Sequence, residues 1–236
     1  MTDYFSQLSE DVRFQEGLNA CINCGTCTAI CPAAEVYDYD PRILTDMLQT
    51  RNNEMVEELL KSDMIWYCGE CMSCKTRCPR NNVPGLLVIA LRNLSQKTGF
   101  FTESEKGRQQ LFLKRSIGEW ILNYGYCVYA PHLHTSMFPE LGDVWDWIDN
   151  HMDDVFTRVG AKLGKDGPGI LRKIQSEDLD ELKAIFDATG GTERYETIEK
   201  YSAKKAKEMG LNLDETHNNE YFLKIYNDND KNHHEF

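Results

Sequence analysis

Two runs of cysteine constrain this chain more than any other feature of its sequence. The first run consists of Cys21, Cys24, Cys27 and Cys31 followed by Pro32, and the second of Cys68, Cys71, Cys74 and Cys78 followed by Pro79. Both have the spacing C-x₂-C-x₂-C-x₃-C-P, which is that of two-cluster ferredoxins. We therefore expect eight of the nine cysteines to hold two [4Fe–4S] clusters.

The spacing within a run predicts which thiolates share a cluster. Three cysteines two residues apart turn around one cubane, whereas the fourth points away along the following helical turn and binds the other cluster. The predicted ligands of the first cluster are Cys21, Cys24, Cys27 and Cys78, and those of the second are Cys68, Cys71, Cys74 and Cys31. This crossing ties the runs together and brings the clusters near each other.

Zinc and disulfides are the alternative uses of so many thiols. Structural zinc sites take four ligands, typically from two C-x₂₋₄-C pairs, and two runs of four thiols with the same proline ending do not match that pattern. The first residues, from Met1 to Phe5, contain no basic segment followed by an apolar one, so we expect no secretory signal. In a reducing cytoplasm, clustered thiols serve as metal ligands or catalysts and do not form a disulfide framework.

Small and hydroxylated residues occupy the loops between the cysteines. Gly25 and Gly69 allow backbone conformations that direct N–H groups toward sulfur. Hydroxyl hydrogen bonds that raise the reduction potential are expected from Thr26, Thr28, Ser73 and Thr76. Plain turn chemistry explains each of these residues equally well, so both interpretations stay open.

Helical periodicity outside the runs predicts an all-α fold, because no segment shows sustained alternation with a period of two. Expected helices run from Ser9 to Leu18, begin at Pro41 and near Met55, and extend from Gly85 to about Lys97. Apolar stripes predict further helices over 113–124 and 144–159, with a loop at 165–169. A later helix begins at Ser176 and stops at Gly190, and the last is capped by Thr192 and stops at Gly210.

The organisation of the chain changes near residue 100. We expect a helical ferredoxin domain over residues 1–98, a helical extension that binds a partner over 99–226, and a disordered tail over 227–236. The aromatic residues Trp120, Tyr124, Trp145 and Trp147 are interpreted as part of a subunit interface. Core packing is the alternative use of such a stripe.

Charge and hydropathy limit the possible partners. The net charge of −12 disfavours nucleic acid, which favours a basic surface. The longest aliphatic run, Leu86 to Leu91, is far below the roughly 20 residues needed to cross a bilayer, so we expect a cytoplasmic protein without a membrane span. Basic residues surround the second run, namely Lys75, Arg77, Arg80 and Arg92. They either compensate cluster charge locally or form a docking patch for an electron partner.

A few isolated residues remain as candidates. Cys127 has aromatic neighbours and no nearby cysteine, so we expect a buried structural thiol. His132 and His134 follow Pro131, where a solvated or capping role is favoured over a metal site. The segment His233-His234-Glu235 belongs to the predicted tail.

The residues around the cysteines resemble those of the C subunit of heterodisulfide reductase. The resemblance rests on Cys24-Gly25-Thr26-Cys27-Thr28 with Cys31-Pro32, and on Trp66-Tyr67-Cys68-Gly69-Glu70-Cys71 with Cys74 and Cys78-Pro79. It covers residues 15–98, and the 36 residues between the runs match a helical dicluster domain in which a helix pair separates them. The extension, including the segment Gly190 to Glu196, is similar to the heterodisulfide-reductase-like complexes of sulfur-oxidising microbes.

This resemblance implies an electron relay without a substrate site of its own. Such proteins pass electrons between a flavin-containing iron–sulfur subunit and a catalytic subunit with cysteine-rich noncubane clusters, and the catalysis belongs to that catalytic partner. An independent ferredoxin-like carrier is the second hypothesis, although such a carrier has no use for the long helical extension. A scaffold whose clusters only stabilise the fold is the third.

Overall fold

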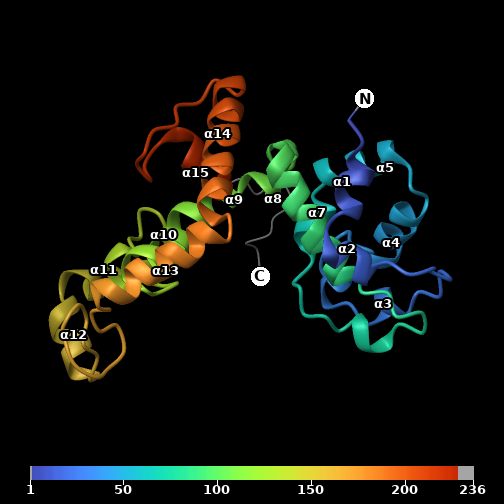
Figure 1. Cartoon of the computed structure of the whole chain (residues 1–236). Coiled ribbons are helices and arrows are strands. Elements are labelled where there is room, and N and C mark those ends of the chain that lie inside the picture. Colours follow the sequence, from blue (N-terminus) through green and yellow to red (C-terminus); the bar gives the residue numbers. More distant parts are fainter. Residues whose placement is uncertain (1, 228–236) are drawn as a thin grey trace. The chain divides into compact units, whose positions relative to one another are not determined.

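The computed structural model describes residues 2–227 of the 236-residue chain. The predicted tail lies outside the described residues, apart from Asn227. Every regular element in the described part is helical, which confirms the all-α class. The chain forms two compact units that divide between Arg108 and Gln109 (Figure 1).

The first unit contains eight α-helices and three 3₁₀ segments among its described residues. In chain order they are α1 (Tyr4–Ser9), α2 (Val12–Gly17), α3 (Thr26–Ala29), η1 (Pro32–Glu35), α4 (Pro41–Gln49), α5 (Asn53–Lys61), α6 (Met64–Tyr67), η2 (Lys75–Arg77), α7 (Pro84–Thr98), η3 (Phe100–Glu103) and α8 (Glu105–Arg108). The helices expected from Pro41, Met55 and Gly85 are confirmed as α4, α5 and α7. The helix expected from Ser9 begins only at Val12, because Ser9 ends the unpredicted helix α1 and Asp11 caps α2. Helix α6 was also not predicted.

Local signals account for the limits of the main helices. Pro41 and Pro84 occupy the first positions of α4 and α7, where a missing N–H costs nothing. The Asp40 carboxylate accepts the N–H of Arg42 at 2.8 Å and so caps α4. Helix α7 ends at Gly99, whose φ of 83° is a left-handed conformation that glycine adopts readily.

Helix α7 is central to the core of the first unit. It packs against α1, α2, α4, α5 and α6. The fully buried side chains on it and its neighbours include Leu44, Leu48, Leu59, Leu60, Leu87 and Leu91. Each such side chain contributes about 1.5–3 kcal/mol when it leaves water. The predicted domain boundary falls after this helix, but η3 packs back onto α5 and α7, and so the contacts of the first unit extend to Arg108.

Helix α2 and the start of α7 hold the flanks of the two cysteine runs together. The Val83 N–H donates to the Gly17 carbonyl at 2.8 Å, and the Asn19 N–H donates to Asn82 Oδ1 at 2.7 Å. Arg80 Nε donates to the Ala20 carbonyl at 3.2 Å. The stretch before the first run therefore lies beside the stretch after the second, although about 60 residues separate them in sequence.

The second unit is also helical in its described part. Its elements are α9 (Gln110–Leu113), the π-helical η4 (Lys114–Gly118), α10 (Glu119–Tyr124), η5 (Ala130–His132), η6 (Pro139–Leu141), α11 (Gly142–Asn150), α12 (Met152–Arg158), α13 (Ser176–Ala188), α14 (Gly191–Glu208) and α15 (Glu220–Asn227). The predicted stripe over 113–124 corresponds to α9, η4 and α10, and the stripe over 144–159 is broken at His151 into α11 and α12. Helix α15 was not predicted.

The junction between α13 and α14 differs from the prediction. Gly190 adopts a φ of 80° and stands at the cap position of α14, which begins at Gly191. Thr192 therefore lies inside the first turn and does not cap the helix. Gly191 is also packed closely, because an added Cβ would lie 2.4 Å from the Phe186 ring. Steric fit between the two helices decides this junction.

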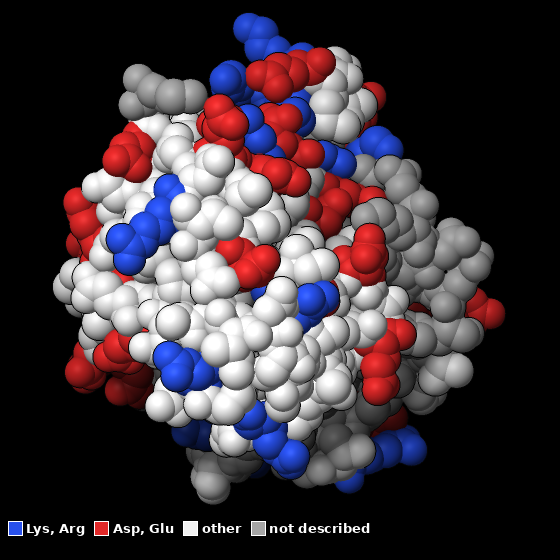
Figure 2. Space-filling view, turned by 90° about the vertical axis from the view of Figure 1, so that its right-hand side faces the viewer, with Lys and Arg blue, Asp and Glu red and all other residues white. Residues whose placement is uncertain are grey.

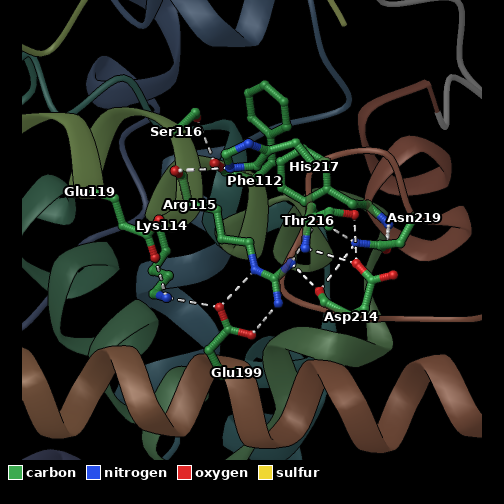
Figure 3. Close-up of polar contacts among 11 residues, drawn as sticks. Phe112, Lys114, Arg115, Ser116, Glu119, Glu199, Asp214, Thr216, His217 and Asn219 are labelled. Carbon is green, nitrogen blue, oxygen red and sulfur yellow. Dashed lines mark hydrogen bonds and ion pairs between the residues drawn. The ribbon is translucent and has the colours of Figure 1, made fainter. Parts of the chain in front are cut away.

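Arg115 anchors the segment that leads from α14 to α15 (Figure 3). Its guanidinium donates two hydrogen bonds of 2.8 Å to the Glu199 carboxylate and others to the carbonyls of Asp214 (2.6 Å) and Thr216 (3.1 Å). Lys114 Nζ also contacts Glu199 at 2.8 Å. This buried cluster joins η4, α14 and the following loop within the second unit.

Candidate iron–sulfur centres

The two cysteine runs adopt the same local conformation. Positive φ angles occur at Asn23 (58°) and Gly25 (77°) in the first run, and at the equivalent Glu70 (52°) and Met72 (57°) in the second. The N–H of Asn23 donates to Cys21 Sγ at 3.3 Å, and that of Glu70 donates to Cys68 Sγ at 3.4 Å. The sequence repeat is therefore a structural repeat in which backbone N–H groups point at sulfur.

The hydroxyls of the loops divide into two groups. Thr26 Oγ1 lies 3.3 Å from Cys24 Sγ and Ser73 Oγ lies 3.4 Å from Cys71 Sγ, as the sulfur interpretation predicts. These contacts lower the pKa of both thiols. In contrast, Thr28 Oγ1 donates to Asp40 at 2.5 Å, and Thr76 Oγ1 donates to the Ser73 carbonyl at 3.2 Å. Thr76 therefore has a turn role. Thr28 contacts the carboxylate that caps α4, and its side chain also acts on the Cys27 thiol, where it opposes the rise in pKa that burial causes.

The two loop glycines differ in conformation, although the N–H that follows Gly69 donates to Cys68 Sγ as expected. Gly25 has the left-handed conformation, but Gly69 is not among the residues with positive φ. Met72 takes that conformation in the second run, although a side chain makes it costly. An added Cβ on Gly85 would lie 2.8 Å from Met72 Sδ, so the start of α7 packs directly on this strained loop.

A cavity of the first unit is lined by Cys21, Cys24, Cys27 and Cys78. These are the predicted ligands of the first cluster, and three come from one run and the fourth from the other. The fourth reaches the cavity because the hydrogen bonds between 17–20 and 80–83 bring Cys78 beside the first loop. Burial raises the pKa of the Cys27 thiol, whereas Cys24 is exposed at the rim.

The second group of thiols surrounds the buried side chain of Tyr39. The Tyr39 hydroxyl lies close to the Cys68 sulfur and within the electrostatic reach of Cys31 and Cys74. Burial, followed by the charge of Cys68, raises the pKa of this hydroxyl, which therefore stays a donor. Cys74 is in turn affected by Cys68 and Cys71, and burial raises the pKa of its thiol. Cys31 of the first run therefore lies near Tyr39 together with Cys68 and Cys74 of the second run.

The donor groups around these thiols suit an iron–sulfur cluster. Backbone N–H groups reach Cys21, Cys68 and Cys78, the last from Asn82 at 3.3 Å. Inside the first cavity the buried Asn82 Nδ2 has no protein partner among the described residues, and cluster sulfur is a suitable acceptor for it. A [4Fe–4S] cluster offers four separate irons, so its ligands surround it and do not converge on one ion.

Comparisons with known proteins agree with this geometry. The family model of the 4Fe-4S dicluster domain matches residues 17–82. The C subunit of the ferredoxin:CoB-CoM heterodisulfide reductase of Methanosarcina acetivorans is 32% identical over 195 residues, which cover 83% of this chain and 70% of that protein. The iron–sulfur C subunit of the CoB–CoM heterodisulfide reductase of Methanopyrus kandleri is 36% identical over 110 residues, covering 44% of this chain and 56% of that protein.

The chain belongs to the family of heterodisulfide reductase C subunits. It is an iron–sulfur, electron-transfer protein with two [4Fe–4S] clusters, as the cysteine runs predict. The Methanosarcina match is long enough to include most of the second unit, whereas the Methanopyrus match covers less than half of the chain. Among the described residues, no helix combines the length and the apolar character that a membrane crossing requires.

The basic residues of this heterodisulfide reductase homologue have different roles. Arg92 is structural, since its guanidinium donates to the carbonyls of Ile65 (2.6 Å) and Cys68 (2.7 Å) and pairs with Glu70. Arg80 reaches Ala20, whereas Lys75 and Arg77 are exposed on η2. On the face drawn in Figure 2, several groups of Lys and Arg lie among uncharged residues, whereas others, at the top of the view, lie next to Asp and Glu. Local positive sites therefore exist in an acidic chain.

The remaining candidates lie in the second unit. Cys127 is exposed, so the prediction of a buried thiol is wrong. His132 Nε2 lies 3.0 Å from the Tyr124 hydroxyl, and His134 Nδ1 lies 3.1 Å from Asp149. His134 is exposed, as a solvated role predicts, whereas His132 is half-buried against the rings of Trp120, Tyr124 and Tyr129, so the predicted solvated or capping role is wrong for it.

The four aromatic residues do not form one surface. Trp120 is buried, and Tyr124 stacks on Tyr129 with ring centroids 4.1 Å apart. Trp145 Nε1 donates to the Leu133 carbonyl at 2.5 Å. Only Trp147 is more than half exposed, at 54%, and it stacks on His151. Part of the stripe thus serves the interior of the second unit.

An open cavity of about 730 Å³ lies between α10, α13 and α14. Three of its charged residues pair with one another, since Lys114 contacts both Glu119 (2.6 Å) and Glu199. Its other side chains include Phe186 and Tyr195. Among the described residues that line it there is no cysteine.

Proposed function

We propose that this chain is the electron-relay subunit of a heterodisulfide-reductase-like complex. It passes electrons between a flavoprotein subunit and a catalytic subunit rich in cysteine. One observation carries the proposal: two thiol groups, each drawn from both runs, lie in one compact unit, and each has an exposed member, Cys24 or Cys71. When bound, the clusters supply one-electron storage close to the surface.

The ligand assignment is part of this proposal. Cys21, Cys24, Cys27 and Cys78 hold the first cluster, and Cys68, Cys71, Cys74 and Cys31 hold the second. The packing of 17–20 against 80–83 supports this crossing because it carries Cys78 to the first loop. Sharing ligands between runs also fixes the distance between the clusters, which is what a relay needs.

The role of the protein around the clusters is to set their stability and potential. Backbone N–H groups and the hydroxyls near Cys24 and Cys71 stabilise negative charge on sulfur, which favours the reduced state. Cys27 and Cys74 are less exposed than Cys24 and Cys71 and form the inner side of each site. Under this proposal, disulfide or sulfur chemistry belongs to the catalytic partner and electron storage to this chain.

The second unit is proposed to bind a partner subunit. Helices α11 and α12 and the loop after them expose Val144 (72%), Trp147 (54%) and Val159, although apolar side chains of this size usually pack inside. A free carrier has no use for such a unit. The similarity of the extension to the complexes of sulfur-oxidising microbes makes that branch our proposal for its origin.

Purification from native extract tests the relay role. The chain should co-purify anaerobically with a flavoprotein and a cysteine-rich subunit, and with about eight irons per chain. Electron paramagnetic resonance should then detect reduced clusters when the electron donor of the complex is added. A persistent monomer with reducible clusters would instead identify an independent carrier, and clusters that never reduce would identify a scaffold.

Charge reversal tests docking near the second run. Arg77→Glu should slow electron transfer to the partner several-fold at low salt, with iron content unchanged, because rim charges mainly affect association rates. Lys97→Glu is the matched control, since Lys97 is exposed at the other end of α7, about 18 Å from Gly85 along the helix axis. Equal rates in both variants would contradict docking at η2.

A further inference from the structure

Asn82 carries a buried amide group whose hydrogen-bonding capacity is only half used. The side chain is 2% exposed. Its Oδ1 accepts the Asn19 N–H at 2.7 Å, and this bond identifies the oxygen end of the amide. Nδ2 is therefore the other end, and it has no partner among the described residues. Buried N–H groups are rarely left unpaired, so this one calls for an acceptor.

The position of Asn82 indicates which acceptor it meets. The residue lines the cavity that also contains Cys21, Cys24, Cys27 and Cys78. Its backbone N–H already donates to Cys78 Sγ at 3.3 Å, which places the residue against the sulfur of a proposed ligand. Among the described side chains that line this cavity, no other has a buried polar atom without a partner.

We propose that the Asn82 side chain donates a hydrogen bond to a sulfur atom of the first cluster and raises its reduction potential. This inference rests on the ligand assignment of the proposed function. Reduction adds one negative charge to the cluster, and a hydrogen bond to sulfur is stronger when the sulfur is more negative. The donor therefore stabilises the reduced state more than the oxidised state and acts as a positioning and tuning group.

Tyr39 holds the corresponding position at the second thiol group. It is 4% exposed, and its hydroxyl lies close to the Cys68 sulfur. One neutral side-chain donor thus faces each group of thiols, an amide in the first and a phenol in the second. The two potentials can then be changed separately by substitution, which makes the assignment of Asn82 testable within one protein.

Two substitutions of Asn82 distinguish the effect of its amide N–H donor from that of its amide oxygen, which is an acceptor. Asn82→Asp keeps an oxygen for the Asn19 N–H but replaces the donor with a negative oxygen. Asn82→Leu removes the donor without adding charge. The matched control is Asn81→Asp, which places the same charge on the neighbouring exposed residue, outside the lining of the cavity. Tyr39→Phe removes the donor at the second group.

The measurement is a redox titration of the full chain followed by electron paramagnetic resonance, with iron content determined in parallel. Both Asn82 variants should lower one midpoint potential by at least about 59 mV, which corresponds to a tenfold change in the equilibrium constant for one-electron reduction. Tyr39→Phe should lower the other midpoint, and Asn81→Asp should shift either by less than half as much. A purely structural Asn82 would alter stability and leave both midpoints in place.

The outcomes distinguish this inference from the proposed function. Wild-type protein without two reducible clusters would overturn both. Wild-type clusters with unshifted midpoints in both Asn82 variants would overturn the role of Asn82 alone. The role would also be refuted if Asn82→Leu and Tyr39→Phe moved the same midpoint, or if both Asn82 variants lost both clusters. If an Asn82 variant lost about four irons while the paramagnetic resonance signal of the second cluster stayed intact, the result would support contact between Asn82 and the first cluster.

Discussion

Paired cysteine substitutions test whether the two runs exchange their fourth ligands. In the first double variant, Cys21→Ala is combined with Cys78→Ala, which removes two residues that line the same cavity. In the second, Cys21→Ala is combined with Cys31→Ala, which removes two residues of the same run. Crossed ligation assigns the first pair to one cluster and the second pair to two clusters. Alanine is used because it offers no oxygen to the iron.

The expected magnitudes follow from four irons per cluster. Wild-type protein should hold about eight irons per chain. The Cys21/Cys78 variant should retain about four, because the ligands near Tyr39 are intact, namely Cys31, Cys68, Cys71 and Cys74. The Cys21/Cys31 variant leaves only three thiolates at each site and should hold far less than four irons after gel filtration.

Iron and acid-labile sulfide per chain, measured anaerobically, give the result. Spin integration of the reduced samples checks that the remaining iron is in a cubane. Cys127→Ala serves as the control, because this thiol is exposed in the second unit and should leave about eight irons. The reverse pattern, with four irons in the Cys21/Cys31 variant and few in the Cys21/Cys78 variant, would show that each run holds its own cluster and would refute the crossing.

Two further predictions concern stability. Glu199→Ala leaves the Arg115 charge buried without its carboxylate and should destabilise the second unit by about 3 kcal/mol in urea unfolding. The control is Glu208→Ala at an exposed position, which should cost less than about 1 kcal/mol. Equal losses of stability in the two variants would contradict this account. Burial alone would raise the pKa of Glu199, but the hydrogen bonds and charges of Arg115 and Lys114 lower it overall. The stability that this carboxylate contributes is therefore present above its unfolded pKa of about 4.3 and is lost as the pH falls through its lower folded pKa. Below about pH 4, the urea midpoint of Glu199→Ala should therefore decline less steeply with falling pH than that of the wild-type protein. Gly17→Ala should destabilise the first unit by about 1–3 kcal/mol in thermal unfolding, because the new Cβ would lie 2.9 Å from the Leu87 side chain where α2 meets α7. Unchanged stability in this variant would show that the contact relaxes.

Several elements could be read from the sequence because their causes are local. Pro41 and Pro84 begin α4 and α7, and Gly99 ends α7, through backbone restrictions of single residues. The hydroxyls of Thr26 and Ser73 lie near the sulfur of the cysteine two residues before them, as their positions in the runs predict. Interactions over two to four residues do not depend on the rest of the fold.

Other features had no local signal. Asn82 and Tyr39 belong to no recognisable motif, and their sites are formed by segments far apart in the chain. Cys127 has aromatic neighbours in sequence but is exposed in the second unit. Likewise, Thr192 is a suitable cap by type, yet the contact of Gly191 with Phe186 fixes the start of α14 at an earlier position.

The sequence by itself determined the helical class and the cluster content, because helix periodicity and the cysteine spacing are properties of short stretches of chain. Only the tertiary structure decided which thiols face the same cavity and which neutral donors meet them. The physical reason is that burial and hydrogen bonding between 17–20 and 80–83 join residues about 60 positions apart. Such contacts arise from the packing of α2 against α7.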